Sequence, residues 1–472
     1  MFQNDPLEPL HYQVILQTVR QRRADHVRHA LHRLNDRRRK PPHGLLVAPL
    51  IFLPLAWGYL LSYVFRTING SIADELVHQF SLDAGSLGLL TSVYFLAFAV
   101  SAIPIGVSLD AFGPRLVQGC LMSVAAVGSV VFAMASGPFA LVAGRTLIGL
   151  GVAGGLMAGL KAHALWVPPR YLPLANGGLM MFGGLGAIMA TLPVGAIDAS
   201  VGWRGTFFLL AAVSLAASVA VFVFVPRRPA SEDRLRSRDA LQGFIGAVTD
   251  RRFLRVAPLS ASVVGTSFAV HGLWAARWFR DVDGFAASDV LDGLLAMGAG
   301  LTLGSLAIGV AAVSLAKLRI SLTNVFGWLC AASMGLQAAV LLDLPMSQFV
   351  LWGALGAFGS IGVLSYSILD SMFPVALVGR ANSALNVLHL TAAWAVQAGM
   401  GAVIAMWPAG PYDHYPVLAY RAAFAMPLAV QMAAFAWFVL SEPLRREELL
   451  AGRLERQAEV DRAKRASARR VH

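Results

Sequence analysis

The chain has 472 residues, of which 57% are hydrophobic and only 14% charged, and its formal net charge is +12. Its mean hydropathy is +0.63. A soluble protein carries about 25% charged residues, and its surface-to-volume ratio leaves no room to bury so much apolar sequence. The composition therefore excludes a soluble enzyme, a disordered chain and a disulfide scaffold, and it predicts a polytopic membrane protein.

The first 44 residues form a polar and strongly basic segment. They contain nine arginine and lysine residues ahead of any long apolar run. A secretory signal has a short basic start and a short apolar middle, so this segment is not one. The apolar residues between Leu10 and Val19 allow either a helix lying on anionic lipid or an unstructured arm. We expect residues 1–44 to be a basic N-terminal arm.

From Leu45 to about Leu440 the chain is apolar, with brief polar interruptions. A spanning helix needs about 20 apolar residues, or more when it is tilted. The interruptions define twelve predicted spans, at 45–72, 85–109, 115–136, 138–167, 173–198, 204–226, 254–280, 287–314, 320–342, 345–372, 379–408 and 417–441. The prediction is an all-α polytopic membrane protein with twelve transmembrane helices in two pseudo-symmetric halves of six. The halves are 45–226 and 254–441, with a linker at 227–253 and a basic tail at 442–472.

The charges outside the spans indicate the orientation. Three basic blocks, at 1–44, 227–255 and 442–472, contain 26 of the 38 arginine and lysine residues. The loops on the opposite side contain mainly aspartate and glutamate. Because cytoplasmic loops are rich in basic residues, both termini and the linker are predicted to be cytoplasmic in the cell inner (plasma) membrane. The basic tails are expected to contact anionic lipids, and no nucleic-acid partner is predicted because short flanks of apolar spans form no folded basic surface.

The junction between the second and third predicted spans carries a short motif. It reads Gly106-Val-Ser-Leu-Asp110-Ala-Phe-Gly113-Pro-Arg115. The glycine at position 106 is expected to let two helices approach closely, and Gly113 to permit a tight turn. Asp110 is expected to accept hydrogen bonds from a helix N-terminus and from Arg115.

This motif resembles the cytoplasmic loop signature of the major facilitator superfamily, although Ala111 and Pro114 replace two residues that are usually basic there. In the fourth span, Arg145-Thr-Leu-Ile-Gly149 is similar to that superfamily's arginine-glycine motif, which is implicated in proton coupling. The resemblance covers about residues 45–441. It implies two halves that rock around a site near the bilayer midplane. It also implies a set of gate and coupling residues, namely Gly106, Asp110, Gly113, Arg115 and Arg145.

Arg66 is the most informative charge inside a span. A charge there costs about 2.5–3.5 kcal/mol on insertion scales, so a charged residue inside a span is expected to have a function. Tyr59, Tyr63 and Arg66 are spaced at i, i+4 and i+7 on one helix face, with Asn69 close by. A guanidinium stays protonated and needs an anionic partner. Two interpretations remain open: Arg66 pairs with an acid such as Asp370 or with backbone carbonyls, or it clamps an anionic substrate.

The segment around Arg66 resembles the first span of organophosphate:phosphate antiporters and related organic-anion carriers, which place an arginine there. That group takes a second arginine from the seventh span, where this chain offers His271 in Val270-His-Gly-Leu-Trp274. With one arginine where that group has two, the resemblance implies a mono-anion or a carboxylate as substrate. His271 titrates near physiological pH, so it is either a carrier of the coupling proton or a hydrogen-bonded core histidine.

Other polar residues inside the spans are candidates to line the path. Lys161, toward the cytoplasmic end of the fourth span, either contacts substrate or extends its ammonium group to the membrane surface. Arg277 and Arg280 near the outer mouth are expected to be rim or gate residues. The eleventh span has a polar stripe at helical spacing that includes Asn386 and His389. The full set of predicted substrate contacts is Arg66, Tyr63, Tyr59, Asn69, Lys161, His271, Trp274, Asn386 and His389.

These features predict a secondary active transporter that moves a small anionic solute by alternating access. Proton-coupled uptake is favoured, because an anion moving toward a negative interior must bring protons with it. One alternative is proton-driven efflux of drugs or metabolites, and another is a non-transporting sensor or biogenesis factor in a transporter fold. The sequence has no metal cluster, nucleophile elbow or phosphate loop. Neither an enzyme nor a cofactor is therefore predicted.

Overall fold

The computed structural model describes residues 47–167, 172–227, 245–317, 321–373, 375–410 and 414–441. The predicted basic arm, the basic tail and most of the predicted linker lie outside the described residues. The chain divides into two compact units, Met1–Pro49 and Leu50–His472. The contacts between helices that build the fold belong to the second unit.

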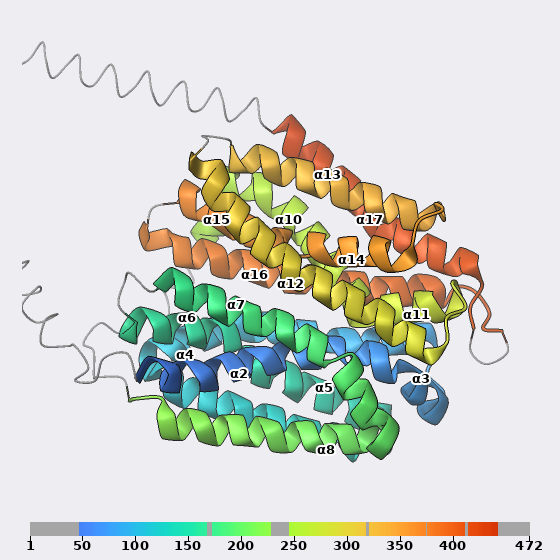
Figure 1. Cartoon of the computed structure of the whole chain (residues 1–472), viewed down its shortest axis with the longest axis horizontal. Coiled ribbons are helices and arrows are strands. Elements are labelled where there is room, and N and C mark those ends of the chain that lie inside the picture. The colour runs from blue at the N-terminus through green and yellow to red at the C-terminus, as the bar shows by residue number, and fades with distance from the viewer. Residues whose placement is uncertain are drawn as a thin grey trace, which may run out of the picture. The chain divides into compact units, whose positions relative to one another are not determined.

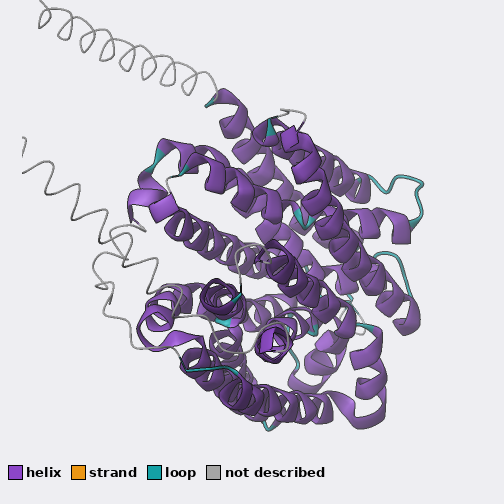
Figure 2. Ribbon diagram, turned by 60° about the vertical axis from the view of Figure 1, so that its left-hand side comes forward, coloured by secondary structure: helices purple, strands orange, loops and turns teal. Residues whose placement is uncertain are grey.

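Every regular element in the described part of the chain is a helix (Figures 1 and 2). The first half contains α2 (Val47–Thr67), α3 (Asn69–Phe80), α4 (Ala84–Ala133), α5 (Pro138–Val152), α6 (Gly155–Trp166), α7 (Leu172–Met189) and α8 (Leu192–Phe224). The second half contains α10 (Arg251–Ala269), the π-helical turn η2 (Val270–Trp274), α11 (Ala275–Asp281), α12 (Ala287–Lys317), α13 (Leu322–Leu341), α14 (Gln348–Phe358), α15 (Ile361–Met372), α16 (Val375–Ile404) and α17 (Val417–Leu440).

The predicted twelve-helix architecture is confirmed, although some spans are broken or fused. Nine helical stretches in the described residues are long and apolar enough to cross a membrane, and three of them join consecutive elements: α5 with α6, α10 with η2 and α11, and α14 with α15. Helices α2 and α3 together make a tenth, bent by 45°. Helix α4 holds two spans, because its backbone leaves helical geometry at Gly113, where φ is 80°. The shorter apolar helix α7 completes the twelve. A positive φ is readily adopted only by glycine, so the turn expected at Gly113 is confirmed.

Several predicted boundaries differ from the helix ends by three or more residues, including the following two. The first span was predicted to end at residue 72, but α3 continues it to Phe80, so Asp74 and Glu75 lie on a helix and not in a loop. The seventh span begins at Arg251, three residues before its predicted start. In both cases the helix extends beyond the apolar stretch into charged residues, Asp74 and Glu75 within α3 and Arg251 and Arg252 in the first turn of α10. Hydropathy alone assigns such residues to a loop.

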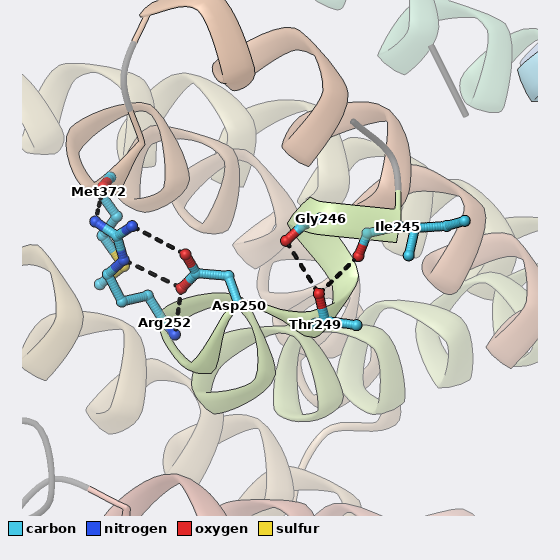
Figure 3. Close-up of polar contacts among 6 residues, drawn as sticks. All are labelled: Ile245, Gly246, Thr249, Asp250, Arg252 and Met372. Atoms are coloured by element: carbon cyan, nitrogen blue, oxygen red, sulfur yellow. Dashed lines mark hydrogen bonds and ion pairs between the residues drawn. The ribbon is translucent and has the colours of Figure 1, made fainter. Parts of the chain in front are cut away.

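The start of α10 is fixed by polar contacts (Figure 3). A helical segment at 245–249 precedes α10, and within it Thr249 Oγ1 donates to the Ile245 carbonyl at 2.9 Å. Asp250 Oδ1 accepts from the Arg252 backbone N–H at 2.8 Å, which satisfies a free donor at the helix N-terminus. Arg252 Nη1 donates to the Met372 carbonyl at 2.7 Å and so joins α10 to the end of α15. The last nine residues of the predicted linker, 245–253, are therefore structured.

The bundle has two ends, which we name after the acidic residue found there. The Asp74 end holds the turns at 81–83, 134–137, 282–286, 342–347 and 405–410. The Asp110 end holds the Gly113 break in α4, the end of α8 and the start of α10. The two halves contact each other through α4 with α16, α7 with α12, and α3 with η2 and α11.

One close approach between the halves lies toward the Asp74 end. A Cβ placed at Gly401 on α16 would lie 2.6 Å from the Ala84 carbonyl oxygen and 3.2 Å from Gly88 Cα, both on α4. By contrast, a Cβ at Gly106 would meet no atom of the described residues within 4 Å. The close helix approach expected at Gly106 is therefore wrong, because no described helix packs against α4 at this position.

Candidate functional site

The candidate site is centred on Arg66, near the end of α2. Its side chain is only 6% exposed. The Tyr63 and Phe268 rings lie against its guanidinium, with Cζ 4.4 Å from the first ring centroid and 4.3 Å from the second. Tyr63 belongs to α2 and Phe268 to α10, so the two halves meet at this guanidinium.

Arg66 has no acidic partner among the described residues. Its electrostatic neighbours are tyrosines, including Tyr63 and Tyr94, and its Nε is buried without a hydrogen-bond partner. Asp370, the acid considered from the sequence, is exposed and accepts from Asn382 Nδ2 at 2.7 Å. The pairing of Arg66 with Asp370 is therefore wrong, and the guanidinium is buried with its charge uncompensated.

Tyr59 and Tyr63 lie beside Arg66 as the helical spacing predicts. Their rings are 5.3 Å apart in an edge-to-face arrangement. Tyr59 packs against Leu179 of α7, and its hydroxyl donates to Met180 Sδ at 3.8 Å. The face shared by these tyrosines therefore extends from Arg66 toward α7.

His271 and Trp274 lie on the π-helical turn η2, which joins α10 to α11. His271 is buried, interacts electrostatically with Arg66 and has an Nε2 atom without a hydrogen-bond partner. Trp274 Nε1 donates to the Gln397 carbonyl at 3.2 Å. A π-helical turn holds one residue more than an α-helical turn and often occurs at functional sites. Of the two residues predicted here, His271 is near Arg66, whereas Trp274 packs between the halves toward the Asp74 end.

A hydrogen-bonded network in the second half contains both predicted residues of α16. The Tyr366 hydroxyl donates to Asn386 Oδ1 at 3.2 Å and lies 3.4 Å from His389 Nδ1. His389 Nε2 is 2.8 Å from Ser260 Oγ, which in turn donates to Ser365 Oγ at 2.9 Å. Tyr366 also interacts electrostatically with Arg66. Tyr366 therefore connects Asn386 and His389 to the site around Arg66.

Asn69 and Arg145 are paired with each other, away from the Asp110 end. Arg145 Nη2 donates to Asn69 Oδ1, and Arg145 Nη1 donates to the Phe65 carbonyl at 3.2 Å. Both side chains are buried in the first half. Asn69 is therefore engaged with Arg145, and the structure does not place Arg145 at a gate with Asp110. Instead, Arg145 binds the α2–α3 bend on both sides of Ile68, immediately next to Arg66.

The Asp110 end shows a different pairing from the expected one. Lys161 Nζ on α6 lies 2.6 Å from Asp110 Oδ1 on α4. Arg115, which was expected to donate to Asp110, instead lines a surface groove with Phe112 and Leu116. The pairing between Asp110 and Arg115 is therefore wrong, because Lys161 approaches Asp110 from the neighbouring helix. The role of Lys161 as a substrate contact stays a prediction.

Charged residues join the two halves at the Asp74 end. Asp74 on α3 forms ion pairs with Arg280 and, at 3.3 Å, with Arg277, both on α11. Asp281 accepts from Arg280 Nε at 2.7 Å and lies 2.9 Å from His414 Nδ1. The rim position expected for Arg277 and Arg280 agrees with these contacts.

Two residues of the site were missed by the sequence reasoning. Phe268 lies three positions before His271, so helical spacing alone places it on the same face. Tyr94 is fully buried on α4, and its hydroxyl donates to the Ser62 carbonyl at 2.8 Å. Nothing in the local sequence distinguishes Tyr94 from a lipid-facing aromatic residue.

Apolar helices in two halves, with a buried arginine between them, are the architecture of a membrane carrier. The chain belongs to the Major Facilitator Superfamily, whose family model matches residues 55–396. Among solved structures, a bacterial homolog of the human lysosomal transporter Spinster, in an inward-facing and unoccupied conformation, superimposes with a TM-score of 0.69. It is 16% identical, and the match covers 84% of this chain and 98% of that one, a likeness that shows the fold alone.

Relatives in sequence are transporters by name. The chain is 28% identical over 241 residues to a probable sulfoacetate transporter of Cupriavidus necator, covering 48% of this chain and 56% of that protein. It is 33% identical over 135 residues to a nitrate/nitrite transporter of a Picosynechococcus strain, and this match covers 28% of this chain and 24% of that protein. It is 25% identical over 358 residues to a gentisate transporter of Corynebacterium glutamicum, covering 73% and 76%. The matches thus span little more than half of the first relative and about a quarter of the second.

Proposed function

We propose that this protein is a secondary active transporter for a small anion and that Arg66 binds the anion. The observation that carries the proposal is a buried guanidinium with no acidic partner among the described residues and an unused Nε donor. Burying an unpaired charge costs several kcal/mol, so proteins normally pair such groups. A substrate anion would supply the missing charge.

The names of the relatives support an anionic substrate. Sulfoacetate, nitrate, nitrite and gentisate are all anions at neutral pH. Each carries a carboxylate, a sulfonate or a nitrogen oxyanion, and such groups present two oxygens to one guanidinium edge. In this chain the Tyr63 and Phe268 rings lie over the guanidinium of Arg66. The anion would therefore approach the edge, where the N–H donors point.

The remaining contacts come from both halves. Tyr59 and Tyr63 supply hydroxyl groups from the first half, with Lys161 toward the Asp110 end. Tyr366, Asn386 and His389 supply polar groups from the second half. In this proposal the substrate lies between these two sets, with its charged end at Arg66.

Proton coupling would pass through His271. The imidazole is close enough to interact with the positive charge of Arg66, and like charges repel. Once an anion neutralises Arg66, His271 can accept a proton at lower cost. By linkage, the proton and the anion would then favour each other's binding, as symport requires.

Alternating access would use the two bundle ends as gates. In the present conformation, Asp74, Arg277 and Arg280 hold the halves together at the Asp74 end. We propose that these ion pairs break when the halves rock about the site, with 45–226 and 254–441 as the moving bodies. Both termini, the linker and the Asp110 end would face the cytoplasm, and the carrier would lie in the inner membrane.

Uptake into proteoliposomes tests this proposal. Protein would be reconstituted with an alkaline interior, and uptake of labelled sulfoacetate, gentisate and nitrate would be measured separately. We expect accumulation of at least one probe, and a loss of about tenfold or more in Arg66→Gln, because a hydrogen bond to a charged group contributes about 1.5–3 kcal/mol. The control is Arg204→Gln, an arginine at the Asp74 end that donates to backbone carbonyls.

Each outcome has a defined meaning. Equal transport by Arg66→Gln and the wild type would remove the anion-binding role. Loss of pH-driven accumulation in His271→Gln, with anion exchange retained, would support His271 as the proton site. Transport of apolar compounds that is insensitive to Arg66→Gln would favour the efflux alternative.

A further inference from the structure

A groove of about 410 Å³ opens at the Asp110 end, away from the site around Arg66. Its walls come from two helices of the first half, and we call it the Arg115 groove. It is lined by Phe112, Arg115, Leu116, Phe222 and Arg227. The first three belong to α4 around the Gly113 break, and the last two lie at the end of α8.

The base of the groove is held by close packing between α4 and α8. A Cβ at Gly119 would overlap the ring of Phe222, so the two helices touch where the groove closes. Below this point, Ser218 Oγ on α8 donates to the Gly119 carbonyl at 2.7 Å and lies 2.9 Å from Ser123 Oγ. The groove walls are therefore fixed by the fold.

The groove lies where a lipid-facing surface ends. On α8, an apolar stripe at i, i+4 and i+8 is more than half exposed, comprising Leu215, Val219 and Val223. On α4, Phe112 is 63% exposed and Leu116 is 48% exposed. Exposed apolar side chains on a spanning helix contact acyl chains, so the groove sits at the boundary between the hydrocarbon and the headgroup layer.

Two arginines, unpartnered within the described part of the chain, give the groove its charge. Neither Arg115 nor Arg227 forms an ion pair or hydrogen bond with any described residue, and no carboxylate is among the described residues that line the groove. Two guanidinium groups above apolar walls complement a ligand with an anionic head and a hydrocarbon body. A phosphodiester accepts such donors through its oxygens.

We propose that the Arg115 groove binds an anionic phospholipid. Arg115 and Arg227 hold the phosphate, and Phe112, Leu116 and Phe222 contact the upper part of an acyl chain. This site is separate from the basic tails, and it does not depend on which solute the protein carries. Arg115 follows Gly113 by two residues and Asp110 by five. A lipid bound to Arg115 would therefore stabilise the turn between the second and third spans.

Native mass spectrometry of the full-length protein tests the proposal. Protein in detergent would be mixed with equal amounts of dioleoylphosphatidylglycerol and dioleoylphosphatidylcholine, and the ratio of the two in the first bound lipid would be measured. We expect phosphatidylglycerol to predominate. In the double variant R115Q/R227Q the ratio should fall about tenfold or more, since each arginine near a membrane surface contributes about a factor of five to anionic lipid binding.

Matched variants separate the groove from general charge effects. R445Q/R446Q removes the same charge from the basic tail and should change the ratio less than twofold. R115K/R227K keeps the charge without the planar donor pair and should retain part of the preference. Monodisperse elution in size-exclusion chromatography would establish that each variant is folded.

Three results would overturn the proposal. One is an unchanged ratio in R115Q/R227Q, which is also the result expected if the chain segment after Arg227 fills the groove. Another is an equal fall in R445Q/R446Q, which would indicate unspecific attraction. The third is displacement of the lipid by excess inorganic phosphate, which would assign the groove to a free anion.

Discussion

The contact between Gly401 and α4 gives a direct test of how the two halves separate. In the structure a methyl group at this position would lie 2.6 Å from the Ala84 carbonyl oxygen and 3.2 Å from the Trp274 ring. The substitution Gly401→Ala therefore cannot be accommodated while the halves meet at the Asp74 end. Conformations in which α4 and α16 are apart have room for the added methyl group.

The size of the effect follows from the overlap. An ordinary carbon–oxygen contact is about 3.3 Å, so α16 must move away from α4 by roughly 0.7 Å. Overpacking of this kind costs about 1–3 kcal/mol. Because the cost falls only on the conformation closed at the Asp74 end, the population open at that end should rise about 5- to 150-fold.

Thiol labelling measures this population. Ala276 on α11 is buried against α3 and would carry a reporter cysteine, Ala276→Cys, after Cys120 and Cys330 are replaced by serine and alanine. The rate of reaction with a hydrophilic maleimide should rise in Gly401→Ala. The control is Gly335→Ala on α13, where a Cβ would meet no atom within 4 Å. Equal rates in the two variants would refute the assignment of this contact as part of a gate.

Three further predictions concern stability and affinity. Gly300→Ala would overlap the Gly353 carbonyl within the second half, so it should lower the free energy of unfolding by roughly 1–3 kcal/mol, seen as a lower thermal midpoint than that of Gly335→Ala. Arg145→Gln should lower the free energy of unfolding by about 2–4 kcal/mol, because the Phe65 carbonyl and Asn69 lose their hydrogen-bond partner. Because the α2–α3 bend lies next to Arg66, the variant should also bind the anion more weakly in calorimetry. An unchanged affinity would refute the idea that Arg145 positions Arg66. Burial raises the pKa of Asp283, in the loop after α11, to about 6. The folded protein therefore keeps this proton at pH values where the unfolded chain, with a pKa of about 3.9, has lost it. The stabilisation is present below about pH 4 and is lost as pH rises through 6. In Asp283→Asn that part of the pH dependence of the thermal midpoint should vanish.

Features encoded by local sequence could be predicted, and pairings across the bundle could not. The turn at Gly113 follows from a backbone conformation that glycine adopts readily, and the face shared by Tyr59, Tyr63 and Arg66 follows from helical spacing. The Lys161–Asp110 pair joins residues 51 positions apart. Its formation depends on how α4 and α6 are packed, which hydropathy and motifs do not specify.

The same limit explains the error at Gly106. A glycine in a spanning helix permits a close approach, but it does not say which neighbour comes close or in which conformation. At Gly401 the partner helix is present, and at Gly106 it is absent from within 4 Å. The hydrogen bond between Arg145 and Asn69 could not be predicted for a related reason, because each side chain can bind a ligand as well as it can bind the other.

The aromatic surroundings of Arg66 are divided between the two halves. Tyr63 moves with α2, on which Arg66 itself lies, whereas Phe268 moves with α10. Any rotation of one half against the other must draw Phe268 off the guanidinium and admit water to that face. A guanidinium in contact with water holds an anion less tightly than one enclosed by rings. In the proposed mechanism, the affinity of Arg66 for the solute would therefore depend on how far the halves have rotated, and this rotation would itself couple binding to release.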